Sequence, residues 1–511
     1  MRCLFVASEV AGFAKTGGLA DVAASLPRAL SERGLDCAVI MPLYRSVRYA
    51  GKPPEPTGLT FTIPMGPKIV QGSLWRSGLP PTKPQGAPIP VYLIEQPDYF
   101  ERDDPKLGQG IYQFTDATGQ KRDYTDNSER YGFFCRAVLE AIRLLDFWPD
   151  VLHVNDWQTG LVPVYLREIY PRQARSPYRA RYARIKTLCT IHNLAYQGTF
   201  SHVDMALLGL PWRLFNIDQV EYYNRINFLK AGVVFSDVIT TVSPTYAREV
   251  QTPLFGCGLQ GVLLERSAKF HGIVNGADYQ VWNPLTDMHI AANYDEVTLT
   301  TNKPLCKAAL QSSLGLEPNP RMPLLGMVSR LANQKGFDLL AQCVLDLLKE
   351  KVQLVILGEG DAAYQQLLEK LHETYPRQVA ISLSQNDKLA HQIEAGADMF
   401  LMPSQYEPCG LTQLYSLKYG TVPIIRVTGG LADTVVDATP ENRAAGKATG
   451  FAFVLYTAKA FFDTVKKALT MYRDQPEQWL ALQRTGMRQD WSWGRSAAEY
   501  ERLYRSALDS M

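Results

Sequence analysis

The chain has 511 residues, too many for a single hydrophobic core, so we expect two domains. A hydrophobic content of 46%, a charged content of 20% and a net charge of +2 exclude bulk nucleic-acid or membrane-surface binding, and no apolar run is long enough to span a bilayer. The eight cysteines contain no C-x-x-C pair and the seven histidines no H-x-H or H-x-x-x-H pair, so we expect reduced thiols, no zinc site and a cytoplasmic location.

In the first half, short apolar runs alternate with helical patterns, which predicts an α/β domain with a parallel sheet and crossover helices. The Pro- and Gly-rich stretch 51–90 favours loops, with a hairpin as the alternative. The basic stretch 171–184 indicates a solvated insertion or a contact for an oligomer partner or an anion, so homo-oligomerisation stays open. The expected strands are 3–7, 38–41, 91–95, 151–154, 186–191 and 238–242, and the expected helices include 19–33, 130–145 and 160–169.

The turn Lys15-Thr16-Gly17-Gly18 lies between the first expected strand and helix. Its glycines let the backbone approach a ligand, and the helix N-terminus offers N–H groups to an anion. Lys15 adds a positive charge, and Asp21 is a candidate acceptor for a hydroxyl group. The spacing is not that of a dinucleotide-binding fingerprint, and the alternative is an ordinary turn with a solvated lysine.

The second half alternates in the same way, and its first strand ends in a turn that carries Arg330 and Lys335. We place the domain crossover in the turn-rich stretch 272–284. This gives an N-terminal domain, 1–270, a C-terminal domain, 271–490, and a terminal helix, 491–511, that packs back on the N-terminal domain. Open α/β sheets bind ligands at the carboxyl ends of their strands, so the two ligand edges are expected to face each other across a cleft. The expected strands are 324–328, 353–357, 379–383, 399–402, 423–427 and 451–454, with helices at 337–349 and 497–508.

Two further turns follow strands in this half. Glu407 precedes a turn that opens a helix, where it is either a helix cap or a functional carboxylate. Gly429 and Gly430 form another glycine turn that offers N–H groups to a phosphate or a sugar hydroxyl. Together with the cations of Arg330 and Lys335, these turns indicate a ligand with a diphosphate and a polyhydroxylated end. The chain contains no Asp-x-Asp pair, so we expect no metal and no cofactor.

These residues resemble the bacterial glycogen synthase and plant starch synthase family over nearly the whole chain. The family consists of retaining glucosyltransferases with the GT-B fold, in which two Rossmann-like doubly wound α/β domains face each other across a deep cleft. The resemblance rests on seven motifs in family order: Lys15–Leu19, His153–Trp157, Ile191–Gly198, Asn275–Asp278, Ser329–Gly336, Glu407–Leu414 and Thr428–Leu431.

The resemblance implies a role for each matching residue. Glu407 contacts the donor glucose and supports positive charge at its anomeric carbon, and Asp156 and His192 lie near the transferred glucose. Arg330 and Lys335 hold the diphosphate, and Asn275 lies near the acceptor or the domain crossover. Tyr112 lies outside these motifs; its polar, aromatic surroundings make it a candidate for the acceptor side. The remaining donor-binding residues are Lys15, Gly17, Gly18, Asp21, Gln385, Cys409, Gly410, Leu411, Thr412, Thr428, Gly429 and Gly430.

The implied reaction transfers glucose from ADP-glucose to the 4-hydroxyl at the non-reducing end of an α-1,4-glucan, which elongates glycogen. The partners are therefore a nucleoside diphosphate glucose and a glucan, with no nucleic acid and no membrane. We favour front-face attack over double displacement, because no second carboxylate is well placed as a nucleophile. Two positions depart from the wider pattern. Tyr415 replaces a second glutamate, and Gln385 replaces an aromatic residue that can stack on the base. Because of Gln385, the choice between ADP-glucose and UDP-glucose as the donor stays open.

Three other functions compete with this interpretation. They are a UDP-sugar-dependent GT-B transferase, a non-catalytic glucan-binding relative and a phosphorylase. The last needs a lysine that carries pyridoxal phosphate, which the resemblance does not offer. Plainer roles also exist for single residues: a core histidine for His192, a helix cap for Asp156, a small buried filler for Cys409, and packing for Trp157 and Tyr112.

Overall fold

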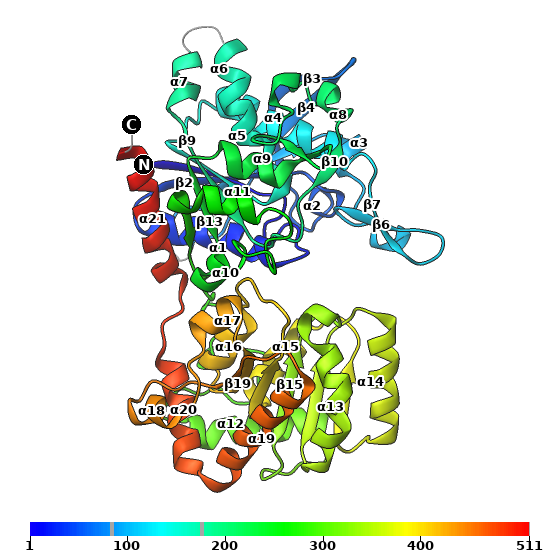
Figure 1. The fold of residues 1–511 in the computed structure, drawn as a ribbon, viewed down its shortest axis with the longest axis vertical. Helices are drawn as coiled ribbons and strands as arrows, with labels where there is room; N and C mark the ends of the chain where they lie inside the picture. Colours follow the sequence, from blue (N-terminus) through cyan, green and yellow to red (C-terminus); the bar gives the residue numbers. More distant parts are fainter. Residues whose placement is uncertain (82–85, 174–177, 510–511) are drawn as a thin grey trace. The chain divides into compact units, whose positions relative to one another are not determined.

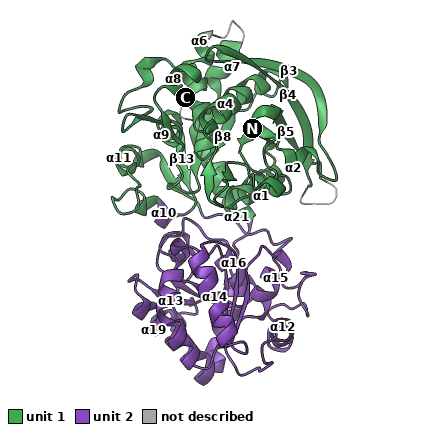
Figure 2. Cartoon of the chain, turned by 90° about the vertical axis from the view of Figure 1, so that its right-hand side faces the viewer, with its two compact units in different colours: residues 1–242, 247–273, 493–511 green, residues 243–246, 274–492 purple. Residues whose placement is uncertain are grey.

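The computed structural model describes residues 1–81, 86–173 and 178–509. The chain forms two compact units, which Figure 2 shows in different colours. Unit 1 consists of residues 1–242, 247–273 and 493–511, and unit 2 of residues 243–246 and 274–492. Each unit alternates strands and helices along the chain (Figure 1). Within the described ranges, no helix is both long and apolar enough to cross a membrane.

Unit 1 is built on a nine-stranded sheet with the order β14-β13-β9-β8-β1-β2-β5-β4-β3. The strands from β14 to β5 run parallel, and β4 pairs antiparallel with both β5 and β3. Because β1 lies between β2 and β8, the winding reverses there, and ligands bind beyond the carboxyl ends of strands at such a point. The strands are β1 (Arg2–Val6), β2 (Asp36–Pro42), β3 (Glu55–Met65), β4 (Lys68–Leu79), β5 (Ile89–Glu95), β8 (Val151–Asn155), β9 (Lys186–Ile191), β13 (Val238–Thr241) and β14 (Phe270–Gly272).

The central strands of unit 1 are continuous apolar runs, as expected for a parallel sheet that helices cover on its faces. All five residues of β8 are buried, and α1 buries its apolar side with Leu19, Val22 and Leu26. The helices of unit 1 are α1 (Gly18–Glu32), α2 (Arg45–Arg48), α3 (Pro97–Phe100), α4 (Asn127–Leu144), α5 (Leu161–Glu168), α6 (Tyr170–Gln173), α7 (Tyr178–Arg184), α8 (Asp204–Leu207), α9 (Phe228–Phe235), α11 (Gln260–Glu265) and α21 (Trp493–Asp509), while α10 (Pro244–Glu249) begins in unit 2.

Two stretches of unit 1 were left open by the sequence. Within the stretch 51–90, β3 and β4 form a long antiparallel hairpin, so the alternative to loops is confirmed for residues 55–79. The described residues of the basic stretch lie in α6 and α7, where Arg172 pairs with Glu168 at 3.1 Å and Arg181 with Asp146 at 3.0 Å. Arg175 lies outside the described residues.

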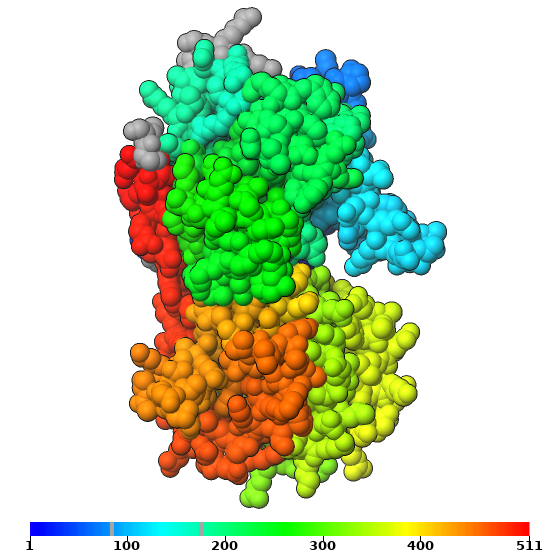
Figure 3. Space-filling model, viewed as in Figure 1, coloured from blue at the N-terminus to red at the C-terminus, as the bar shows by residue number. Residues whose placement is uncertain are grey.

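Smaller sheets complete unit 1. The hairpin of β6 (Gln113–Thr115) and β7 (Lys121–Asp123) stands out from the surface of the unit (cyan in Figure 3). A three-stranded sheet has the order β10-β12-β11, with β10 (Thr199–Ser201), β11 (Glu221–Tyr222) and β12 (Arg225–Asn227).

Unit 2 contains a six-stranded sheet with the order β17-β16-β15-β18-β19-β20, in which every pair is parallel. The strands are β15 (Leu324–Val328), β16 (Gln353–Leu357), β17 (Val379–Ser382), β18 (Met399–Met402), β19 (Val422–Arg426) and β20 (Phe451–Phe453). The helices are α12 (Leu299–Ser313), α13 (Phe337–Lys349), α14 (Ala362–Thr374), α15 (Asp387–Gly396), α16 (Thr412–Lys418), α17 (Gly429–Thr434), α18 (Pro440–Ala444), α19 (Ala458–Asp474) and α20 (Pro476–Arg488).

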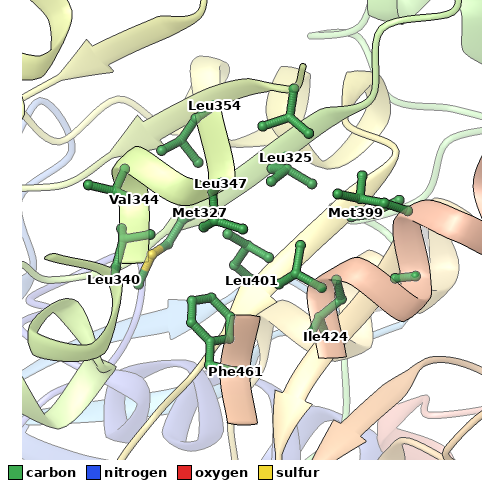
Figure 4. Close-up of a cluster of buried hydrophobic side chains, with 14 of the residues drawn as sticks. Leu325, Met327, Leu340, Val344, Leu347, Leu354, Met399, Leu401, Ile424 and Phe461 are labelled. Carbon is green, nitrogen blue, oxygen red and sulfur yellow. The ribbon is translucent and has the colours of Figure 1, made fainter. Parts of the chain in front are cut away.

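The core of unit 2 lies between this sheet and its helices. Figure 4 shows strand residues such as Leu325 and Leu401 packed against Leu340 and Val344 of α13 and Phe461 of α19. All five are buried, so the core holds β15 and β18 in place and with them the loops that follow their carboxyl ends.

The C-terminal helix α21 packs against α1 in unit 1. Tyr504 of α21 bonds through its hydroxyl to His153 Nδ1 at 2.7 Å, and His153 Nε2 lies 2.6 Å from Thr190 Oγ1. Glu501 pairs with Arg33 at 2.7 Å. The first residue of the His153–Trp157 motif is therefore a core residue that anchors the terminal helix.

Candidate active site

The Lys15 turn follows β1 and leads into α1. Lys15 Nζ donates to Asp21 Oδ1 at 2.8 Å, so Asp21 holds the exposed lysine in place. The buried Glu9 carboxylate accepts hydrogen bonds from the amides of Thr16 and Gly17 and, at 2.7 Å, from Thr16 Oγ1. The Thr16 and Gly17 amides are therefore already occupied within the protein. Of the amides that the sequence predicts for anion binding here, those of Gly18 and Leu19, at the start of α1, have no partner among the described residues.

Tyr112 reaches the same carboxylate from the loop before β6. Its hydroxyl donates to Glu9 Oε1 at 2.6 Å and lies 2.7 Å from Ser8 Oγ. Its ring packs against Tyr131 and Trp157 at centroid distances of 5.9 and 6.3 Å. Tyr112 is therefore fixed beside the Lys15 turn by both packing and hydrogen bonding.

Asp156 follows β8 and has an unusual backbone. Its φ of 55° and ψ of −171° lie in a region that residues other than glycine rarely adopt, and such strain is concentrated at functional sites. Its side chain does not cap the next helix; instead Oδ1 accepts the His192 amide at 2.7 Å. Burial raises the pKa of Asp156 to about 7, against the opposing effect of the His192 and Asn193 amides, and the charge of Glu9 adds to the rise.

His192 follows β9, the neighbour of β8. Its Nε2 lies 2.9 Å from Asn155 Oδ1, and burial lowers the pKa of His192 to about 3, so the imidazole is neutral at physiological pH. A neutral imidazole serves here as a hydrogen-bonding group, not as a cation. The side chains of Lys15, Asp156 and His192 thus come from loops at the carboxyl ends of the adjacent strands β1, β8 and β9, and Tyr112 comes from the loop before β6.

Trp157 has a packing role, as the sequence favours. Its ring contacts Tyr131, Phe200 and Phe228 at centroid distances of 5.0, 5.6 and 6.4 Å. A Cβ atom at Gly198 would meet the Trp157 ring at 2.4 Å, so the Ile191–Gly198 motif ends in glycine because the indole lies against its backbone.

In unit 2, Lys335 and Glu407 form an ion pair. Lys335 Nζ lies 2.6 Å from Glu407 Oε2, and Ser404 Oγ donates to the same oxygen at 3.1 Å. Glu407 is only 6% exposed, so the carboxylate is oriented by two donors in a nearly water-free environment. The N-cap residue of α16 is Leu411, so Glu407 is not a helix cap.

The turn before α13 brings Arg330 and Lys335 beyond the carboxyl end of β15. The exposed Arg330 donates to Gln334 Oε1 at 3.3 Å, a weak contact that leaves its guanidinium accessible to an anion. Gly336 has a φ of 80°, and a Cβ atom there would lie 2.2 Å from the carbonyl oxygen of Pro403. Glycine therefore lets the basic turn pack on the chain that follows β18, close to Glu407.

The two glycines of the turn before α17 permit close backbone contact. A Cβ atom at Gly429 would lie 1.9 Å from the carbonyl oxygen of Glu407, and one at Gly430 would lie 2.1 Å from that of Cys409. The Gly430 amide donates to the carbonyl oxygens of Glu407 and Pro408 at 3.1 and 3.2 Å, so it is occupied within the protein. Thr428 is buried just before these glycines.

The segment from Cys409 to Thr412 runs from the Glu407 loop into α16. Burial raises the pKa of Cys409 to about 12, so its thiol is neutral and inert, and its side chain fills space. Gly410 has a φ of 74°, and the buried Gln413 side chain donates to its carbonyl oxygen at 3.1 Å. The Thr412 hydroxyl lies 3.5 Å from Met402 Sδ, so the segment is held firmly against β18.

Asn275 lies in unit 2 and is 5% exposed. Among the described residues its Oδ1 atom has no hydrogen-bond partner. A buried amide oxygen without a partner is costly, so a hydroxyl group of a ligand is a suitable donor for it.

The two residues that depart from the family pattern also lie in unit 2. Gln385 is exposed after β17, and its Nε2 lies 3.3 Å from Glu359 Oε1. Tyr415 stacks on Trp282 with centroids 4.1 Å apart and an interplanar angle of 3°, and Trp282 stacks on His391 at 3.8 Å. Tyr415 therefore has a packing role. In the part of the chain that the structure describes, no three His, Cys, Asp or Glu side chains form a group that could hold a metal ion.

Comparison with known proteins gives the class of this fold and site. The model of the starch synthase catalytic domain matches residues 2–265, and that of glycosyl transferases group 1 matches residues 315–481. The catalytic domain of starch synthase IV from Arabidopsis thaliana, solved with ADP and acarbose, superposes with a TM-score of 0.87 at 32% identity over 99% of each chain. Sucrose-phosphate synthase from Thermosynechococcus elongatus, 16% identical with a TM-score of 0.57 over 100% of both chains, shares the fold. The protein is a glycosyltransferase with the GT-B fold.

Full-length relatives narrow this class. A glycogen synthase from Rhodopirellula baltica is 46% identical over 99% of this chain and 98% of its own. One from Syntrophotalea carbinolica is 47% identical over 100% of this chain and 99% of its own. The chain belongs to the glycogen synthase family.

Sequence reasoning missed Glu9, Ser404 and Asn155, which hold the predicted residues in place. Glu9 carries the clearest signal, because a carboxylate at the end of a strand, just ahead of a Gly-rich turn, is well placed to accept the amides of that turn. Asn155 carries no comparable signal, since its partner His192 follows another strand, whereas Ser404 lies only three residues before Glu407 in the same loop.

Proposed function

We propose that this glycosyltransferase moves glucose from ADP-glucose to the 4-hydroxyl at the non-reducing end of an α-1,4-glucan, with retention of configuration. The observation that carries the proposal is the Lys335–Glu407 pair of unit 2, a cation and a carboxylate 2.6 Å apart at the end of a parallel sheet. The starch synthase IV catalytic domain, solved with ADP and acarbose, supports a donor with an adenosine diphosphate and a glucan-like acceptor.

The charges of unit 2 suit the departure of a diphosphate. As the bond between C1 of glucose and the phosphate oxygen breaks, the diphosphate keeps the electron pair, and Arg330 and Lys335 neutralise its charge. Positive charge develops at C1, and the Glu407 carboxylate stabilises it. Because Lys335 and Ser404 both bond to Glu407, this carboxylate is better suited to electrostatic support than to nucleophilic attack.

We therefore favour attack on the same face that the diphosphate leaves. The acceptor O4 forms the new bond to C1, and its proton passes to a phosphate oxygen of the leaving group. In unit 1, Lys15 supplies a further cation for the donor phosphates, and Asp156 and the neutral His192 bind glucose hydroxyls. Asn275 and Tyr112 are assigned to the acceptor. The backbone of residues 409–412 and 428–430 is assigned to the donor.

The identity of the donor base rests on Gln385. Its amide and the neighbouring Glu359 carboxylate offer hydrogen bonds, whereas an aromatic side chain would offer a stacking face worth roughly 1–3 kcal/mol. UDP-glucose is the alternative donor. Preference for adenine over uracil would show that recognition of the base does not need a stacking residue at position 385.

We further propose that the transfer needs no metal ion and takes place in the cytoplasm. Fixed cations at Arg330 and Lys335 perform the charge neutralisation that a divalent ion performs in other transferases. The eight cysteines, all within the described ranges, are free thiols, which suits a reducing compartment.

The experiment follows radiolabelled glucose from ADP-glucose into maltooligosaccharides. We expect label at the non-reducing end in a bond that an exo-acting α-1,4-glucan hydrolase releases, and an α configuration in the anomeric proton signal of the product. A β-linked product or label without acceptor dependence would contradict the proposal.

A further inference from the structure

Glu9 occupies a position in unit 1 that the proposed transfer does not itself use. It lies three residues after β1, is 3% exposed, and has no cation beside it among the interactions of the described residues. A buried carboxylate is costly unless hydrogen bonds satisfy it. Glu9 is satisfied by two backbone amides and two hydroxyls, and these donors belong to loops that carry candidate site residues.

These donors come from two different segments. The Thr16 and Gly17 amides and the Thr16 hydroxyl belong to the Lys15 turn, and the Tyr112 hydroxyl belongs to the loop before β6. Tyr112 in turn packs on Trp157, the neighbour of Asp156. The Glu9 carboxylate thus joins two loops that carry candidate site residues of unit 1, and the Tyr112 ring extends the contact to the loop of Asp156.

We propose that Glu9 is a positioning residue for glucosyl transfer, which fixes the Lys15 turn and Tyr112 in a single geometry. The inference rests on the proposed function, because it gives Glu9 a purpose in that reaction. The carboxylate occupies the amides of Thr16 and Gly17 from inside the protein. A donor phosphate is therefore directed to the Lys15 side chain and to the amides of Gly18 and Leu19.

The charge of Glu9 provides a second effect. Asp156, which follows β8, is faced by Glu9 from the loop after β1, by Cys189 from β9 and by His192 from the loop after β9. His192 is neutral, and burial raises the pKa of Cys189, so Glu9 is the charged group that Asp156 faces in this set. Removal of the Glu9 charge is expected to lower the pKa of Asp156.

Two substitutions separate position from charge. In Glu9→Gln, the amide oxygen still accepts the two backbone amides, and its NH₂ group donates to the Thr16 and Tyr112 hydroxyls, which are able to accept. The geometry is kept while the charge is lost. In Glu9→Ala, the acceptor itself is lost and the two amides have no internal partner.

Glu129→Gln is the matched control. Glu129 is also a nearly buried glutamate of unit 1 that accepts a tyrosine hydroxyl, that of Tyr99, and it pairs with Lys68 at 2.6 Å. It contacts none of the loops that carry the candidate site residues. The same chemical change is therefore made at a comparable site without touching those loops.

Hydrogen–deuterium exchange of the full chain tests the positioning role without turnover. We expect the amides of Thr16 and Gly17 to exchange roughly tenfold or more faster in Glu9→Ala, and to remain protected in Glu9→Gln and Glu129→Gln. Equal protection in Glu9→Ala and in the unsubstituted protein would overturn the inference, whatever the kinetics show.

Kinetics then test the role in transfer. Glu9→Ala is expected to raise KM for ADP-glucose roughly tenfold or more. In Glu9→Gln, we expect a KM close to that of the unsubstituted protein and an acid limb of kcat/KM that moves to lower pH. Glu129→Gln should change neither quantity, and identical behaviour of Glu9→Ala and Glu129→Gln would contradict the inference. Exchange that follows the prediction in a protein without acceptor-dependent release of nucleotide would instead count against the proposed function.

Discussion

Replacement of Asp156 by asparagine should change how the stability of the protein depends on pH. Burial raises the pKa of this carboxyl from 3.8 to about 7 in the folded chain. The folded state therefore holds the proton more tightly than the unfolded state. This stabilisation is fully present below about pH 4 and is lost as the pH rises through 7. Asparagine does not titrate and still accepts the His192 amide, so Asp156→Asn lacks this loss.

The magnitude follows from linkage. Each unit of pKa difference is worth 1.36 kcal/mol, so between pH 5 and pH 8 the unsubstituted protein should lose about 3 kcal/mol relative to Asp156→Asn. At about 2 °C per kcal/mol for a unit of this size, the difference in Tm changes by about 6 °C.

Scanning calorimetry of both full-length proteins at pH 5, 6, 7 and 8 measures this difference directly. We expect the Tm of the Asp156→Asn protein to rise relative to that of the unsubstituted protein with each increase in pH. The transferase activity of the Asp156→Asn protein should be lost. Parallel Tm curves across this range would refute the assignment of a raised pKa to Asp156. A Tm of the Asp156→Asn protein that falls relative to that of the unsubstituted protein as the pH rises would show that the carboxyl is stabilised in its charged form.

Three further predictions concern unit 2 and the reaction. Glu407→Gln should lower kcat by about 10³-fold in a protein that stays folded, because it removes a charge that acts on the transition state, and near-normal turnover would exclude Glu407 from the mechanism. Cys409→Ala should keep most of the activity, and iodoacetamide should not inactivate the unsubstituted protein, since the buried thiol is neutral with a pKa of about 12; rapid loss of activity on alkylation at Cys409 would contradict this. Transfer should persist in excess chelator, because Arg330 and Lys335 neutralise the diphosphate; strict dependence on added Mg²⁺ would overturn the metal-free mechanism.

Much of the fold could be predicted because its strands are short buried apolar runs between turns. The expected strands 324–328, 353–357 and 399–402 match β15, β16 and β18 residue for residue, and the other expected strands lie within two residues of their observed bounds. The hairpin of β3 and β4 was harder to predict, because Pro and Gly in this half-exposed pair mask the alternation of its strands.

The candidate site also has a part that the sequence predicts and a part that it does not. Charged residues in glycine turns, such as Lys15 and Lys335, are visible in the sequence because their position after a strand is local. The partners that decide what each group does are not local: Glu407 is 72 residues from Lys335, and Tyr112 is 103 residues from Glu9. The positive φ of Asp156 has no local signal either, because residues other than glycine rarely adopt it.

Release of nucleoside diphosphate from ADP-glucose and from UDP-glucose, each with and without glycogen as acceptor, is the most direct measurement of the proposed transfer. We predict acceptor-dependent release with a higher kcat/KM for ADP-glucose. Preference for UDP-glucose would contradict the donor assignment and leave the transfer chemistry in place. No release from either donor, in a folded protein that still binds glycogen, would contradict the catalytic role itself.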